Sequence, residues 1–124
     1  MKIIDGKKLS QKILAQVKVE VASLPFQPVF CDVLVGNNKV SKQYVEMKAR
    51  AAENVGILFY QANFSSTITT GQLIKEIKIL NEIPNMCGII LQLPLPLQID
   101  TRLALDAVDS RVDVDCLGTM AGNK

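Results

Sequence analysis

The chain has 124 residues, 48% of them hydrophobic and 21% charged, which is the size and composition of one globular domain. A net charge of +2 and an aromatic content of 5% give no basic or stacking surface for nucleic acid. The sequence contains no run of about 18 apolar residues, which is the length needed to cross a membrane. Because the chain has no histidine, Ser-His-Asp and Cys-His catalysis and histidine metal sites are excluded within it.

The three cysteines are Cys31, Cys87 and Cys116. Their odd number, their wide spacing and the absence of a C-x-x-C pair argue against a disulfide framework or a zinc site. These features favour a cytoplasmic, reducing location. Cys31 and Cys87 lie in apolar, strand-like runs, and we expect both to be buried.

The first half of the chain predicts a helix, a strand and a second helix. The first helix covers residues 6–23, and its core-facing apolar stripe consists of Leu9, Ile13, Val17 and Val21. Residues 29–35 are apolar and β-branched and predict a strand, in which Asp32 marks either a sheet edge or a polar partner. A second helix follows the loop at 36–39 and ends near Val55, before a glycine suited to left-handed capping geometry.

The second half predicts a strand at 57–63, a helix at 69–82, a strand at 86–91 and a short helix at 100–108. The apolar stripe of the longer helix consists of Leu73, Ile74, Ile77 and Leu80. The tail from residue 109 lacks periodicity and is expected to be a loop. The alternation predicts a three-layer α/β fold with a mostly parallel sheet of three to four strands, residues 1–4 being the candidate fourth.

Lys48 is the first candidate for chemistry. It shares a helical stripe with Tyr44, Ala51 and Val55, and this stripe is expected to face the core. Another face of the helix carries the polar residues Gln43, Glu46, Arg50 and Glu53. A sheltered lysine one turn from a tyrosine hydroxyl is suited to proton transfer. The alternative is that Lys48 lies at the margin of the stripe and extends to solvent.

Two further polar groups are expected near Lys48. Parallel strands end at one edge of their sheet, where ligands bind, and Gln92 closes the third strand at that edge. Its amide oxygen could accept a hydrogen bond from Lys48, although a solvated strand end explains it equally well. Asp115, in the run Asp-Val-Asp, could accept N–H donors from a ligand, although most acidic loop residues are simply solvated. The run lacks the other ligands of a calcium loop, so no metal is expected.

Three blocks of sequence resemble the N-terminal catalytic domain of the bifunctional methylenetetrahydrofolate dehydrogenase/methenyltetrahydrofolate cyclohydrolase family. They are Val35 to Lys48 with Gly56 following, Gly88 to Pro96 with Asp100 following, and Asp113 to Asp115. The Gln-Leu-Pro-Leu-Pro run at 92–96 is specific, and the order and spacing of the blocks also fit. The likeness covers nearly the whole chain but only the first half of a family member.

The resemblance implies a role for each candidate residue. Lys48 would be the main catalytic residue, Tyr44 would lie against the folate ring, Gln92 would tune the lysine, and Asp115 would bind the pterin-like ring. The predicted substrate-binding residues are Tyr44, Lys48, Gln92, Leu93, Pro94 and Asp115. The family oxidises 5,10-methylene-tetrahydrofolate with NADP or NAD and hydrolyses 5,10-methenyl-tetrahydrofolate to 10-formyl-tetrahydrofolate. A homodimer is possible.

The resemblance also implies that the folate and the NAD(P) cofactor bind to two different domains. Residues 1–124 would form the folate-binding catalytic domain, and a Rossmann-type NAD(P)-binding domain would follow them in the family. The chain has no G-x-G-x-x-G, so we expect no cofactor site in it and no NADP-dependent oxidation by it alone. Two alternatives are a non-catalytic folding, dimerisation or folate-binding module and a lyase that uses Lys48 as a Schiff-base nucleophile.

One departure from the family pattern concerns Cys116. The family usually has glycine directly after the Asp-Val-Asp run, where this chain has Cys116. If that position needs a positive φ, the cysteine side chain strains it and puts the Asp115 loop in doubt.

Overall fold

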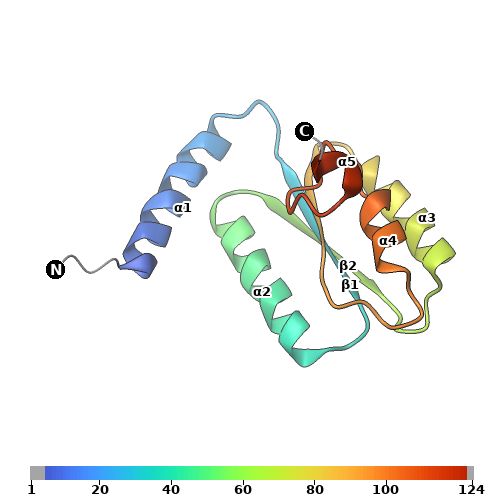
Figure 1. Ribbon diagram of the computed structural model, residues 1–124. Coiled ribbons are helices and arrows are strands. Elements are labelled where there is room, and N and C mark those ends of the chain that lie inside the picture. The colour runs from blue at the N-terminus through green and yellow to red at the C-terminus, as the bar shows by residue number, and fades with distance from the viewer. Residues whose placement is uncertain (1–4, 123–124) are drawn as a thin grey trace.

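Three parallel strands form the sheet at the centre of the molecule, in the order β2-β1-β3 (Figure 1). A computed structural model describes residues 5–122. The strands are β1 (Val29–Val35), β2 (Leu58–Phe64) and β3 (Met86–Leu91). The helices are α1 (Gly6–Ala22), α2 (Lys39–Asn54), α3 (Thr70–Asn81), α4 (Thr101–Ala107) and α5 (Thr119–Gly122). The predicted α/β class is confirmed with three strands, and the candidate fourth strand at 1–4 lies outside the described residues.

The main hydrophobic core lies between the sheet and the pair α3 and α4, on the side opposite α2 (Figure 1). Alternate residues of β1 point to this side, because successive side chains of a strand face opposite ways. Fully buried members of the core include Cys31, Val33, Leu73, Ile77 and Ala104. The stripe predicted for α3 therefore faces the core, and α3 begins at Thr69 with a capping box that Gln72 completes.

The helix α1 differs from the prediction. It forms over the expected residues, but none of its residues is buried, and Leu9 and Ile13 are each 52% exposed. Figure 1 shows the helix standing apart from the sheet, and only its last turns approach the rest of the chain. The expected core-facing stripe is therefore wrong for the first half of α1, since nothing in the described residues covers it.

Two other predictions need correction, and one open choice is resolved. Asp32 lies on β1, the central strand, which selects the polar partner over the sheet edge. Cys87 is exposed, because β3 is an edge strand of this sheet. The tail is not entirely loop, since Asp113 forms a parallel bridge with Ile89 and the short helix α5 follows.

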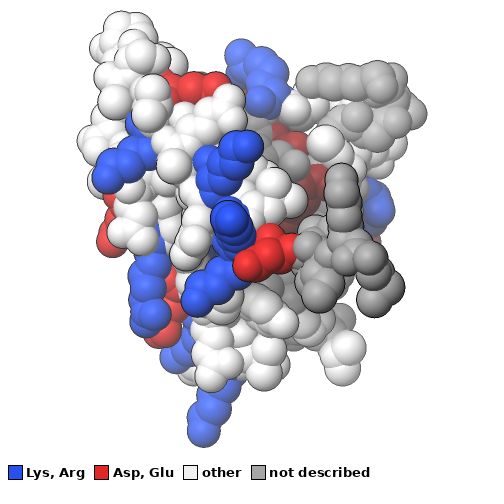
Figure 2. All heavy atoms as spheres, turned by 90° about the vertical axis from the view of Figure 1, so that its left-hand side faces the viewer, with Lys and Arg blue, Asp and Glu red and all other residues white. Residues whose placement is uncertain are grey.

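The surface formed by the left-hand side of Figure 1 carries scattered charge. Figure 2 shows Lys and Arg side chains on this face with acidic and uncharged side chains between them. Within residues 5–122, no helix has the length and apolar character needed to cross a bilayer.

Candidate active site

The Lys48 amine lies between two oxygen atoms from neighbouring strands. Its Nζ donates to Gln92 Oε1 at 2.7 Å and to Asp32 Oδ2 at 2.9 Å. The contact with Gln92 was predicted from the common edge of the strands, and it is present. The partner that the sequence left open for Asp32 is this lysine.

The backbone explains why these three side chains meet. Asp32 pairs with Ile90 across β1 and β3, and the Gln92 N–H donates to the Val33 carbonyl at 2.9 Å, which continues the ladder by one step. Because side chains alternate along a strand, Gln92 falls on the same face as Ile90 and Asp32. The helix α2 covers this face, and Asn38 caps its start by accepting from the Ser41 N–H at 3.0 Å.

The carboxylate of Asp32 is unusual in being wholly buried. Its relative exposure is 0%, whereas the Lys48 side chain is 32% exposed. Burial raises the pKa of Asp32 above its ordinary value, while the hydrogen bond and charge of Lys48 act to lower it and the charge of Asp115 adds to the rise. The buried oxygen Oδ1 has no hydrogen-bond partner among the described residues.

The other predicted site residues are more exposed than Lys48. Tyr44 is 54% exposed, so the prediction that it belongs to a core-facing stripe is wrong, and Val45 is the residue buried there. Leu93 and Pro94 follow Gln92 on the surface, and Asp115 is exposed in its loop. Asp115 lies close enough to Asp32 for their charges to interact. Within residues 5–122, Asp115 forms no ion pair with Lys48.

An apolar hollow of about 320 Å³ adjoins Lys48. Its walls come from α1, α2 and the sheet and include Leu14, Phe30, Ala51 and Ile90. The hollow lies on the same face of the sheet as Asp32 and Gln92, and Lys48 both lines the hollow and contacts these two side chains. An apolar wall near a few polar groups is typical of small-molecule sites.

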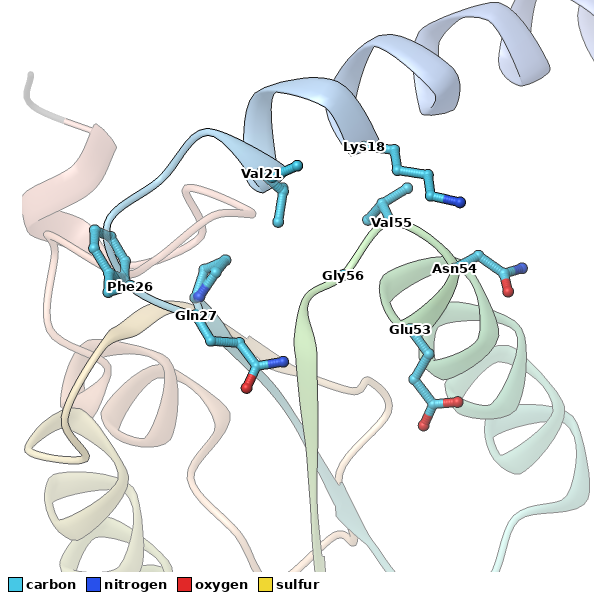
Figure 3. Close-up of a pocket in the computed structure, with 10 residues that line it drawn as sticks. Lys18, Val21, Phe26, Gln27, Glu53, Asn54, Val55 and Gly56 are labelled. Atoms are coloured by element: carbon cyan, nitrogen blue, oxygen red, sulfur yellow. The ribbon is translucent and has the colours of Figure 1, made fainter.

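A second hollow, of about 430 Å³, lies at the opposite edge of the sheet (Figure 3). Its lining comes from the end of α1, the segment before β1 and the turn after α2, as the labelled Val21, Gln27 and Gly56 show in Figure 3. Its lining includes none of Lys48, Asp32 and Gln92 and contains no buried charged group, so we assign it no chemistry.

Comparison with known proteins gives the family. A family model described as the catalytic domain of tetrahydrofolate dehydrogenase/cyclohydrolase matches residues 4–115. The chain belongs to this family. The resemblance drawn from the three sequence blocks is thereby confirmed.

Curated relatives of this chain carry the name bifunctional protein FolD. The protein from Nautilia profundicola is 45% identical over 118 residues, which cover 93% of this chain and 42% of that protein. The protein from Helicobacter hepaticus is 42% identical over 118 residues, which cover 93% of this chain and 41% of that protein. The chain thus spans less than half the length of these relatives.

Solved structures of the same family share the fold. The bifunctional FolD enzyme of Campylobacter jejuni aligns with a TM-score of 0.90 at 34% identity, over 96% of this chain and 43% of that chain. Trypanosoma brucei FolD, solved with NADP cofactor and an inhibitor, aligns with a TM-score of 0.86 at 30% identity, over 94% and 41% of the two chains.

The buried thiol of Cys31 gives a first prediction. Burial, and secondarily the neighbouring Asp32 charge, raises the pKa of Cys31 to about 12. Since the thiolate is the reactive form, we expect Cys87 and Cys116, which are exposed, to react with a disulfide reagent at pH 8 while Cys31 reacts only after unfolding. Thiol counting before and after denaturation measures this, and three fast thiols in the folded protein would contradict it.

The strain expected at Cys116 gives a second prediction. Cys116 has a φ of 56°, so the condition for strain is met. Replacing Cys116 with glycine is expected to raise the free energy of unfolding by up to about 1 kcal/mol, because the relief of strain exceeds the entropy that glycine adds to the unfolded chain. Urea denaturation measures the difference, and a less stable Cys116→Gly variant would contradict the expectation. Cys87→Gly, in a strand, is the control and is expected to lose stability.

Proposed function

We propose that this chain is the folate-binding catalytic part of an enzyme with two activities. It would take part in oxidising 5,10-methylene-tetrahydrofolate with NADP and in hydrolysing 5,10-methenyl-tetrahydrofolate to 10-formyl-tetrahydrofolate. The observation that carries the proposal is the Lys48 amine, held by Gln92 and Asp32 beside an apolar hollow in a chain of this family.

Lys48 would transfer protons in the hydrolysis. The methenyl carbon carries delocalised positive charge, and water attacks it while the neutral amine accepts a proton from that water. The bond from this carbon to one ring nitrogen then breaks, and the protonated amine donates its proton to the departing nitrogen. The hydroxyl proton leaves to solvent as the formyl group forms, so one proton is released for each substrate hydrolysed.

The remaining candidate residues would hold the substrate. Tyr44 is exposed one helical turn before Lys48, where its ring is available to a flat ligand. Leu93 and Pro94 continue the chain beyond Gln92 at the same edge of the sheet. Asp115 would accept N–H donors from the pterin-like ring, which agrees with its exposure.

NADP would be the co-substrate of the oxidation, as the Trypanosoma brucei relative solved with NADP suggests. The described residues do not fit this cofactor, because none of the turns that follow β1, β2 or β3 is glycine-rich. We therefore place the NADP site outside these residues, in a Rossmann-type domain, and derive no oxidation step from them.

Location and assembly complete the proposal. The three cysteines are unpaired, which supports the reducing cytoplasm. The outer strand β2 exposes Leu58 and Tyr60, which supports a homodimer, and no nucleic acid or membrane partner is proposed. A monomer at micromolar concentration in analytical ultracentrifugation would contradict the dimer.

Hydrolysis of 5,10-methenyl-tetrahydrofolate tests the proposed function. Its absorbance is expected to fall faster with the native protein that contains this chain than in buffer alone, and addition of 5,10-methylene-tetrahydrofolate and NADP is expected to produce NADPH. Binding of the folate in calorimetry without any turnover would show a non-catalytic module and would reject the proposal.

A further inference from the structure

Asp32 is a charged group that the fold itself does not require. It occupies the middle of the central strand with 0% exposure, where the neighbouring strand residues are apolar. One of its oxygens, Oδ1, has no hydrogen-bond partner among the described residues. A buried ion pair of this kind adds little stability compared with an apolar residue of similar volume, because both groups lose their hydration.

The groups around Asp32 come from four segments. Lys48 reaches it from α2, Asp115 from the loop after α4 acts on it through space, and Cys31 adjoins it in β1. Gln92, at the end of β3, shares the Lys48 amine with it. Lys48 is the cation that contacts this carboxylate within residues 5–122, so the negative charge of Asp32 is directed at one amine.

We propose that Asp32 is a positioning residue that orients the Lys48 amine for proton transfer. The inference rests on the proposed function. A neutral amine has two hydrogens and one lone pair. Asp32 Oδ2 and Gln92 Oε1, at 2.9 and 2.7 Å from Nζ, can take both hydrogens, which leaves the lone pair for the attacking water.

The test is the Asp32→Asn substitution in the native protein that contains this chain. The kcat of methenyl-tetrahydrofolate hydrolysis is expected to be lower by about tenfold or more, because the amine is less well oriented. KM is expected to change much less than kcat, because Asp32 is fully buried and contacts the amine instead of the substrate. Glu53→Gln removes an exposed charge from the same helix and is expected to leave kcat and KM unchanged.

A second measurement does not depend on turnover. The NMR chemical shift of the Lys48 amine, measured at one pH without substrate, is expected to change in Asp32→Asn and not in Glu53→Gln, because Asp32 contacts this amine. An unchanged chemical shift would overturn the inference, even if the wild type proves inactive and the proposed function fails. A wild type that hydrolyses the substrate, together with an unchanged kcat in Asp32→Asn, would overturn the inference alone.

Whether the Asp32 variants fold shows whether Asp32 positions the amine or is needed for the folded structure. Asp32→Asn and Asp32→Val are both expected to fold, since Lys48 is 32% exposed and can turn to solvent when its partner is removed. Loss of the folded state in both variants would assign Asp32 a structural role and would overturn the inference.

Discussion

Replacing Lys48 with methionine is expected to lower the rate of methenyl-tetrahydrofolate hydrolysis by about 10²- to 10⁴-fold, the usual contribution of general acid–base catalysis. Methionine preserves much of the length of the side chain and removes the amine that Asp32 and Gln92 hold. The absorbance of the substrate measures the rate, and equal rates in wild type and Lys48→Met would remove Lys48 from the mechanism.

Lys48→Arg separates loss of the catalytic base from loss of stability. Methionine leaves the buried Asp32 without a cation, which destabilises the fold, whereas arginine keeps the positive charge beside it. A guanidinium group does not lose its proton in proteins, so it cannot act as the base. We therefore expect Lys48→Arg to be folded and as inactive as Lys48→Met. Activity within tenfold of the wild type would show that no deprotonated amine is needed.

Lys42→Met is the matched control. Lys42 lies on the same helix but is exposed, and within residues 5–122 it forms no ion pair. The change removes one lysine from α2 without reaching the sheet, so we expect hydrolysis to be unaffected. A comparable loss in Lys42→Met would mean that the net charge of the helix, and not one amine, controls the reaction.

The periodicity of the sequence was sufficient to locate the elements of the sheet. The strand predicted at 29–35 and the strand at 86–91 have the limits that the structure shows, because short apolar runs between turn residues allow few other arrangements. The expected contact of Lys48 with Gln92 followed from the same argument, since parallel strands place their ends at one edge.

Other features depend on packing that local patterns do not contain. The stripe of α1 is apolar, yet Leu9 and Ile13 are exposed, because a pattern shows that a face is apolar and not what covers it. Tyr44 is exposed because α2 is oriented with Val45, and not Tyr44, on the side that faces the sheet. The role of Asp32 had one signal in the sequence, an acid within an apolar strand, but the choice between edge and partner required the strand order.

One face of the sheet carries the apolar core, and the other carries the polar site. Odd-numbered residues of β1, such as Cys31 and Val33, enter the apolar core under α3 and α4. The even-numbered Asp32 faces α2, where the buried carboxylate, the amine and the hollow are found. The core therefore stabilises the strand whose other side carries a charge that stability alone would not favour, and such local costs are common at functional sites.

Gly88→Ala is expected to disturb the loop that carries Asp115. A Cβ at Gly88 would stand 2.8 Å from Val114 Cγ1 and 3.1 Å from Phe30 Cδ2, closer than such atoms pack. The added Cβ would press against side chains of both the loop and β1, so we expect the loop to move away from β3. The hydrogen bond from the Ile89 N–H to the Val112 carbonyl, 2.8 Å long, would then weaken. We expect a loss of about 1–3 kcal/mol in the free energy of unfolding.

The effect on the reaction would distinguish binding from proton transfer. If Asp115 binds the ring, its displacement in Gly88→Ala raises KM, while kcat changes less because Lys48 and its two partners stay on the sheet. Gly71→Ala is the matched control, since a Cβ there meets nothing within 4 Å and alanine favours the helix α3. Urea denaturation and steady-state kinetics measure both variants. Equal stability and equal KM in the two would show that the loop adapts to the added methyl group and that its contact with β3 does not position Asp115.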